Sequence, residues 1–306
     1  MGTPGSIRLT LHIASVVRID RVALLIGVVF SLMWSSAYAT ARIIVADAPP
    51  LTALALRFVI AGLIAVALAK TLGQTWRLTA PQWRSTVIFG FCQNGLYLGL
   101  NFVALQWIEA SLASIIASTM PLLVALLGWL LFRQQVRPLG LAGLCAGMVG
   151  VTLIMAARID GGVDLTGVAM CFVAALALAF ATLSVRSASS GGNLLMIVGL
   201  QMLVGAGVLA VAAVALESWQ VTWTLSLGLA FVYQLLVPGL IATLLWFTLV
   251  QRIGAVRAST FHFLNPFFGV AVAALLLGEQ IRVLDMIGVG IVMAGILMVQ
   301  LARQPG

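Results

Sequence analysis

Residues 251–303 read QRIGAVRASTFHFLNPFFGVAVAALLLGEQIRVLDMIGVGIVMAGILMVQLAR and repeat residues 106–158 at a spacing of 145 residues. Of the 53 aligned positions, 16 are identical without a gap. Leucine-rich helices can match through composition alone, but matched Pro, Arg and Gly positions in one register indicate an internal duplication. These matched positions are Pro121 with Pro266, Arg137 with Arg282, Gly143 with Gly288, and Gly150 with Gly295. With a small shift, residues 57–59 also align with residues 201–203.

The amino-acid composition indicates a chain that is embedded in a lipid bilayer. Of its 306 residues, 62% are hydrophobic and 8% are charged, and the mean hydropathy is +1.17. About a quarter of the residues of a soluble protein are charged. This chain lacks the polar side chains to solvate its own surface, so we predict an all-α polytopic membrane protein. Its three cysteines fall in apolar runs without ligand spacing, which indicates packing residues and no metal site.

Apolar runs punctuated by Pro, Gly and charged residues predict ten transmembrane helices. They cover residues 22–45, 51–70, 84–106, 111–132, 138–157, 164–185, 193–216, 225–250, 255–277 and 283–302. Each half of the chain then holds five spans. Because five is odd, the second half (residues 159–306) must enter the membrane inverted relative to the first (residues 1–158). Inverted five-helix repeats around a central cavity are the construction of many secondary transporters.

The charged residues separate according to this topology. With the N-terminus in the cytoplasm, 12 Lys and Arg residues fall on the cytoplasmic side and three on the opposite side, which also holds seven of the eight acidic residues. This bias follows the positive-inside rule and predicts that both termini are cytoplasmic. The net charge of +8 is therefore a topology signal, and we predict no nucleic-acid partner.

Two related motifs carry a resemblance to a known family. ALQWIEASLASIIASTMPLL (104–123) and TLVQRIGAVRASTFHFLNPFF (248–268) each lead from an Ala/Ser-rich helix start to a proline, and LLLGEQIRVLDMIGVGIVMAGILM (275–298) adds a Gly-Glu element and a Gly-spaced helix. In this arrangement the whole chain resembles the drug/metabolite transporter superfamily of EamA type, and within it most resembles the YddG branch of amino-acid exporters. The first half departs from the pattern, because Arg133 and Gln134 stand where the second half has Gly278 and Glu279.

The resemblance implies a ten-helix carrier of the bacterial inner membrane that exports amino acids, including aromatic or apolar ones, and related small metabolites by alternating access. No Asp or Glu lies in the interior of a predicted span, which favours facilitated or weakly proton-coupled transport. We expect no cofactor, and a monomer or weak homodimer whose partners are the bilayer and a small-molecule substrate. A multidrug or organic-cation exporter of the same family is the alternative, followed by an intramembrane enzyme with Ser/His chemistry.

Polar and aromatic side chains inside the predicted spans are candidates for a substrate cavity, because they are costly in lipid unless they meet partners or water. The predicted substrate-binding residues are Trp34, Tyr38, Arg57, Asn94, Tyr97, Asn101, Trp246, His262 and Asn265. The spacing of Asn94, Tyr97 and Asn101 places them on one helical face. Hydrogen bonding between helices is the alternative for the asparagines, and packing is the alternative for the aromatic residues.

Two ionisable residues of this set each have two interpretations. Arg57 either extends to the membrane surface or faces the cavity, where it would attract a substrate carboxylate. His262 either takes part in proton coupling, since imidazole ionises near neutral pH, or bridges two helices.

Prolines and glycines predict where spans bend and touch. Each of Pro121, Pro238 and Pro266 removes a backbone hydrogen bond, so we predict hinges there, with static kinks as the alternative. The stretch STFHFLNPFFGV (259–270) is therefore expected to be a kinked, cavity-facing part of the ninth span. In it, His262 and Asn265 would contact the helix or a ligand. The remaining prediction is close helix packing at the span glycines, which are Gly143, Gly147, Gly150, Gly288 and Gly295.

Overall fold

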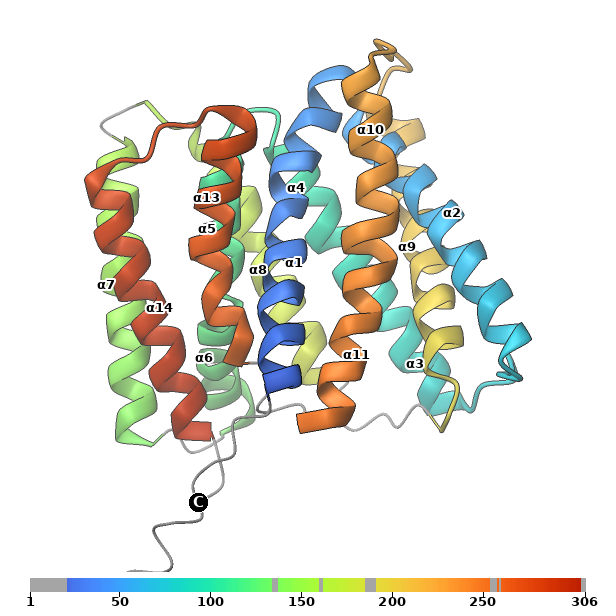
Figure 1. Cartoon of the computed structure of the whole chain (residues 1–306), viewed down its shortest axis with the longest axis horizontal. Coiled ribbons are helices and arrows are strands. Elements are labelled where there is room, and N and C mark those ends of the chain that lie inside the picture. Colours follow the sequence, from blue (N-terminus) through green and yellow to red (C-terminus); the bar gives the residue numbers. More distant parts are fainter. Residues whose placement is uncertain are drawn as a thin grey trace, which may run out of the picture.

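The structure of the chain is a computed structural model that describes residues 21–133, 137–159, 162–184, 191–253, 258 and 260–303. All regular structure in these ranges is helical (Figure 1). Among the described residues, eight helices are long and apolar enough to cross a membrane, and the shorter apolar helices Phe261–Leu277 and Val283–Val299 supply the other two spans. The predicted ten-helix membrane fold is confirmed.

The helices of the first half are α1 (Arg21–Asp47), α2 (Pro50–Thr71), α3 (Ala80–Phe89), the π-helical segment η1 (Gly90–Tyr97), α4 (Leu98–Ala104), α5 (Ala110–Ser118), α6 (Met120–Phe132) and α7 (Pro138–Ile159). Those of the second half are α8 (Leu165–Ser184), α9 (Leu194–Leu216), α10 (Leu225–Gln234), the π-helical segment η2 (Leu235–Ile241), α11 (Ala242–Ile253), the 3₁₀ segment η3 (Thr260–Leu264), α13 (Asn265–Leu277) and α14 (Val283–Arg303). Observed span ends lie within four residues of the predicted ones. The exception is the start of the ninth span, where residues 255–257 lie outside the described residues.

Each predicted hinge proline lies at an irregularity of its helix. Pro121 is the second residue of α6, just after the break from α5 at Thr119, and Pro238 lies inside η2. Pro266 lies in the first turn of α13, directly after η3. A proline cannot donate the hydrogen bond that an α-helix requires at its position, so the ladder is interrupted at these points. Movement at these positions stays a prediction.

The break in the ninth span is stabilised from α1. The Ser31 hydroxyl donates to the carbonyl of Phe261 at 2.9 Å, and the Ser35 hydroxyl donates to the carbonyl of Asn265 at 3.3 Å. His262 and Asn265 belong to different segments, the 3₁₀ segment and α13, rather than to one continuous helix. The backbone carbonyls around Pro266 are therefore satisfied by two serines, which leaves the side chains of His262 and Asn265 for other contacts.

Glycines bring α7 and α14 together at one edge of the molecule (Figure 1). A Cβ added to Gly143 would lie 2.7 Å from the backbone oxygen of Gly295, and one added to Gly295 would lie 2.7 Å from that of Gly143. Gly150 and Gly288 have the same reciprocal relation, at 2.9 and 3.0 Å. An early residue of one helix thus meets a late residue of the other, so the two helices are antiparallel.

This reciprocity is that of a two-fold axis. Gly143 is the sequence equivalent of Gly288, and Gly150 is the equivalent of Gly295. The observed contacts exchange these equivalents, as an isologous interface does. Because the paired helices are antiparallel, the axis lies across them, in the plane of the membrane, as an inverted repeat requires. At the opposite edge, α2 and α9 meet through the reciprocal contacts of Gly62 and Gly199.

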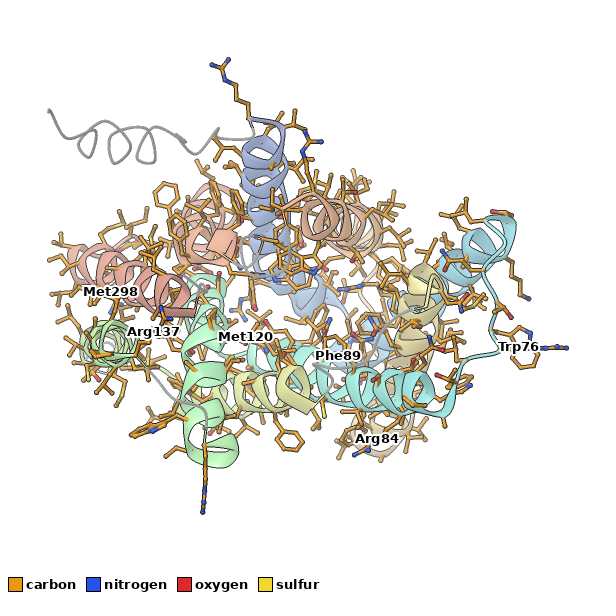
Figure 2. The ribbon with its side chains drawn as sticks, turned by 90° about the horizontal axis from the view of Figure 1, so that it is seen from below. Trp76, Arg84, Phe89, Met120, Arg137 and Met298 are labelled. Atoms are coloured by element: carbon orange, nitrogen blue, oxygen red, sulfur yellow. The ribbon has the colours of Figure 1, made fainter. Side chains whose placement is uncertain are left out.

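Charges separate between the two ends of the helix bundle. The upper face of Figure 1 is defined here as the end with the α1–α2 and α13–α14 connections, and the lower face as the end with the α2–α3 connection. Figure 2, seen from below, shows Trp76, Arg84 and Arg137 at the lower face. At the upper face, the carboxylates of Asp47 at the end of α1, Glu217 after α9 and Glu279 after α13 accept hydrogen bonds from segments distant in sequence.

Two of these carboxylates tie the second half to helix starts of the first. Glu217 accepts from the backbone N–H groups of Leu51 and Thr52 at 2.6 and 2.8 Å, at the start of α2. Glu279 accepts from those of Ala110 and Ser111 at 2.7 and 3.0 Å, at the start of α5. Helix N-termini leave such groups unpaired and favour negative charge, so each carboxylate stabilises the helix that it caps.

Candidate functional site

The first cavity lies among α1, α2, η1, α4 and the broken eighth span. Its volume is about 60 Å³. Because one water needs about 10–15 Å³, the cavity holds a few waters or one small solute. Apolar and aromatic side chains make up most of its wall. The polar groups in it belong to Tyr38, Arg57, Gln93, Asn94, Tyr97, Asn101, Gln234 and Thr243.

Arg57 carries the only formal charge in the wall of this cavity, as far as the structure describes it. Its side chain is 6% exposed, so it does not extend to the membrane surface. Its Nη1 donates to Oε1 of Gln234 at 2.7 Å, and its guanidinium carbon lies 4.8 Å from the centre of the Phe58 ring. Its Nε has no hydrogen-bond partner, and within the described residues no carboxylate pairs with it.

The side-chain amide of Gln234 binds Arg57 through its oxygen and α1 through its NH₂ group. Its Nε2 donates to the carbonyl of Ala37 at 2.5 Å and to Oγ1 of Thr40 at 3.0 Å. Both acceptors lie on α1 and require the NH₂ end of the amide, so the oxygen end must face Arg57. Gln234 is completely buried, which fixes this orientation. An amide oxygen satisfies one guanidinium N–H without neutralising the charge.

The second cavity lies on the other side of an aromatic partition. Three residues, Trp34, Tyr38 and Tyr97, line both cavities and form the wall that they share, which is called the aromatic partition here. The hydroxyl groups of Tyr38 and Tyr97 are 2.5 Å apart and hydrogen-bonded, which joins α1 to the end of η1. The rest of the second wall comes from the α5–α6 break, the ninth span and α8, through Ala117, Ser118, Met120, Pro121, Leu178, His262 and Asn265.

His262 and Asn265 form a pair in the wall of the second cavity. Nδ2 of Asn265 lies 3.0 Å from Nδ1 of His262. The imidazole ring is held between Phe30, edge-on at 5.5 Å, and Trp246 at 5.1 Å. Oδ1 of Asn265 is buried without a hydrogen-bond partner.

The structure brings eight of the nine predicted substrate-binding residues into the walls of these two cavities. Trp246 is in neither wall, and it packs behind His262 and against Phe30. Asn94 also makes a bond between helices, as the alternative interpretation expects, by donating to the Gln201 carbonyl of α9 at 3.0 Å. Asn101 donates to the Tyr97 carbonyl of its own span at 2.7 Å and accepts from Sγ of Cys171 on α8 at 3.4 Å.

Sequence reasoning missed Gln93, Gln234 and Thr243, although each is a polar residue inside a predicted span. The cost of such groups in lipid was sufficient reason to include them. Gln234 was detectable for a second reason, because a buried arginine needs an acceptor within reach. No cluster of three or more His, Cys, Asp or Glu side chains suited to a metal ion occurs in the described ranges.

With this geometry in place, comparisons with known proteins identify the family. A sequence model of the EamA-like transporter family matches residues 21–156 and matches again at residues 165–301. The chain belongs to the EamA-like transporter family. It is therefore a multi-pass membrane transporter, and the two matches fall one in each half.

Relatives of known sequence or structure match this chain over most of its length. The uncharacterized transporter YvbV of Bacillus subtilis (strain 168) is 25% identical over 280 residues, which cover 91% of each chain. Protein PecM of Dickeya dadantii (strain 3937) is 26% identical over 282 residues, 88% of this chain and 89% of that one. A crystal structure matches with a TM-score of 0.65 at 22% identity, over 92% of this chain and 97% of that one, and shares the fold.

Proposed function

We propose that this EamA-like transporter exports amino acids, including aromatic or apolar ones, and related small carboxylate-bearing metabolites. The observation that carries the proposal is Arg57, a buried cation in a cavity wall with only an amide and an aromatic ring as partners among the described residues. A buried charge without a counter-charge is costly. A substrate carboxylate would offset this cost through charge-assisted hydrogen bonds to the guanidinium group.

The rest of the first cavity is compatible with an amino acid. Its volume fits one small solute, and Trp34, Phe58 and Phe102 offer apolar and aromatic surface for a side chain. No Lys or second Arg accompanies Arg57 in this wall as described, which disfavours phosphorylated substrates. The sequence resemblance to the YddG branch of amino-acid exporters supports the same class.

Transport would proceed by alternating access of two inverted halves in the bacterial inner membrane, with both termini in the cytoplasm. Pro121, Pro238 and Pro266 would act as hinges, since each lies where its helix is already irregular. Neither described cavity wall holds an Asp or Glu, so we infer a facilitative or weakly proton-coupled carrier. We further propose that it works as a monomer or weak homodimer.

Counterflow in proteoliposomes tests this function. Vesicles loaded with an unlabelled amino acid should take up labelled Thr, Met or Phe in a saturable manner, with and without a pH gradient. Arg57→Gln should lower uptake by at least about tenfold, the effect of losing a hydrogen bond to a charged group. Arg77→Gln is the matched control, because it removes the same charge from the loop that follows α2, outside both cavities.

Failure of every amino acid to exchange would contradict the proposal. The second candidate is then an exporter of organic cations, which the aromatic partition of Trp34, Tyr38 and Tyr97 favours through cation–π contacts. Collapse of uptake when only the proton gradient is dissipated would contradict the facilitative mechanism and leave the substrate class standing.

A further inference from the structure

The two cavities differ in the hydrogen-bonding groups that they offer. The first has a guanidinium group, which only donates. The second has no Lys, Arg, Asp or Glu in its described wall, and its polar members apart from the tyrosine pair are Ser118, His262 and Asn265. An anion would therefore find a full counter-charge in the first cavity and none in the second.

Two side chains of the second cavity, Ser118 and Asn265, have oxygen atoms left to accept a hydrogen bond. The Ser118 hydroxyl spends its proton on the carbonyl of Ser114 at 2.6 Å, which leaves its oxygen lone pairs available. The amide of Asn265 donates to Nδ1 of His262, while its Oδ1 has no partner. Asn265 is 7% exposed, and a buried acceptor without a donor is costly. A ligand that donates a hydrogen bond to this oxygen would remove that cost.

Aromatic rings complete the environment for a cation. Trp34, Tyr38 and Tyr97 form the partition side of the second cavity. The faces of such rings attract ammonium groups, most strongly where water is excluded. An uncharged acceptor together with aromatic faces allows a cation to bind and also to leave, whereas a buried carboxylate would hold it more tightly.

We infer that the second cavity is a binding position for a primary ammonium group, with Oδ1 of Asn265 as its acceptor and the Trp34–Tyr38–Tyr97 partition as its aromatic wall. The inference rests on the proposed function in that the carboxylate position at Arg57 lies on the other side of this partition. The ammonium group belongs either to the same amino acid after it has passed the tyrosine pair or to a separate amine.

Three probes that share one phenylethyl skeleton separate the two positions. Phenylalanine carries both charges, N-acetylphenylalanine keeps only the carboxylate, and phenethylamine keeps only the ammonium group. Their binding to the full-length chain in detergent is measured by isothermal titration calorimetry. In Asn265→Leu, the affinity for phenethylamine should fall by about tenfold, the effect of one hydrogen bond to a charged group, and by more than the affinity for N-acetylphenylalanine. Asn265→Asp should raise the phenethylamine affinity.

The matched control is Thr86→Val, which changes a fully buried polar side chain that donates only to the Gln82 carbonyl and lies in neither cavity wall. If phenylalanine also weakens in Asn265→Leu, the ammonium group is that of the transported amino acid. If only phenethylamine weakens, the ligand is a separate amine. The inference is wrong if phenethylamine fails to bind the unmodified chain, or if Asn265→Leu weakens both single-charge probes equally.

Failure of the proposed function gives a different result. If Arg57→Gln leaves the affinity for N-acetylphenylalanine unchanged, Arg57 is not the carboxylate site. The Asn265 result with phenethylamine would still stand, because that probe has no carboxylate.

Discussion

At the scale of single residues, Arg57 and Gln234 act as one unit in the first cavity. The arginine supplies the charge, and the glutamine fixes its position through an amide whose other end is anchored on α1. Because the glutamine is neutral, it orients the guanidinium group without competing for the charge. A carboxylate at position 234 would orient the guanidinium group and also neutralise its charge.

The variant Gln234→Glu tests this division of roles. The new carboxylate would form a buried ion pair with Arg57 and neutralise the group that a substrate needs. The affinity for N-acetylphenylalanine should fall by at least about tenfold, while phenethylamine binding is affected less. Calorimetric titration of both probes decides the matter, and an unchanged affinity for N-acetylphenylalanine would show that the charge of Arg57 is not used.

The Tyr38–Tyr97 pair makes a separate prediction about stability. Tyr97 is 3% exposed and Tyr38 is 9% exposed, so removal of either hydroxyl leaves the other buried without its partner. Each single Phe variant should cost about 1–3 kcal/mol of unfolding free energy, and the double variant should cost less than the sum of the two. Unfolding in mixed SDS micelles followed by circular dichroism measures the cycle. Strict additivity would mean that the two hydroxyls do not stabilise each other.

At the scale of helices, packing of glycine against glycine determines how closely the two halves approach. Gly150 lies at the contact with Gly288, where no room is left for a side chain. In contrast, a Cβ on Gly290 of α14 would meet nothing within 4 Å. The same substitution on neighbouring helices therefore has opposite consequences.

Gly150→Leu should lower the unfolding free energy by about 1–3 kcal/mol, because an overpacked contact forces the backbones of α7 and α14 apart. Gly290→Leu, the matched control, should be neutral or stabilising, since leucine favours helix more than glycine does. Thermal unfolding in detergent compares the two. Equal effects of both variants would contradict the assignment of a close contact at Gly150.

The positions of the helices could be predicted from the sequence better than the places where the helices are irregular. Span ends follow from apolar length and from charged and proline residues, which are local properties, so they agree with the structure. The breaks near Pro121, Pro238 and Pro266 were expected for the same reason. The π-helical segment η1 contains no proline and was not expected from sequence, and its glycines lie against α9. Gln234 could have been noted as a polar residue inside a span, but its pairing with Arg57 and the position of Trp246 depend on which helices become neighbours, and no local pattern contains that information.

One departure within the repeat has a local explanation. Arg133 stands where the second half has Gly278, and the two residues end equivalent helices in the left-handed conformation, at φ of 49° and 68°. Glycine adopts this conformation without strain, whereas an arginine does so at a cost. Both halves therefore have the same turn, one with arginine and the other with glycine, and the backbone symmetry extends further than the sequence identity does.

At the scale of the whole molecule, orientation in the membrane is the property to test. The positive-inside rule predicts that the lower face, with Trp76, lies in the cytoplasm and that Trp219, after α9, lies outside. Both side chains are well exposed, at 62% and 73%. With Cys92, Cys145 and Cys171 replaced by alanine, Trp219→Cys should react with a membrane-impermeant maleimide in intact cells, and Trp76→Cys should react only after permeabilisation. The reverse pattern would invert the assigned topology.

The reciprocal glycine contacts also bear on how such a chain can be assembled. At both edges of the molecule, a helix of one half meets a helix of the other across small residues, and neither edge depends on a covalent link between the halves. A gene split between α7 and α8 would therefore yield two five-helix fragments whose contact surfaces are complementary. Co-expressed, they should reassemble in one bilayer, much as two oppositely inserted copies of a single ancestral fragment would have done before fusion fixed their order.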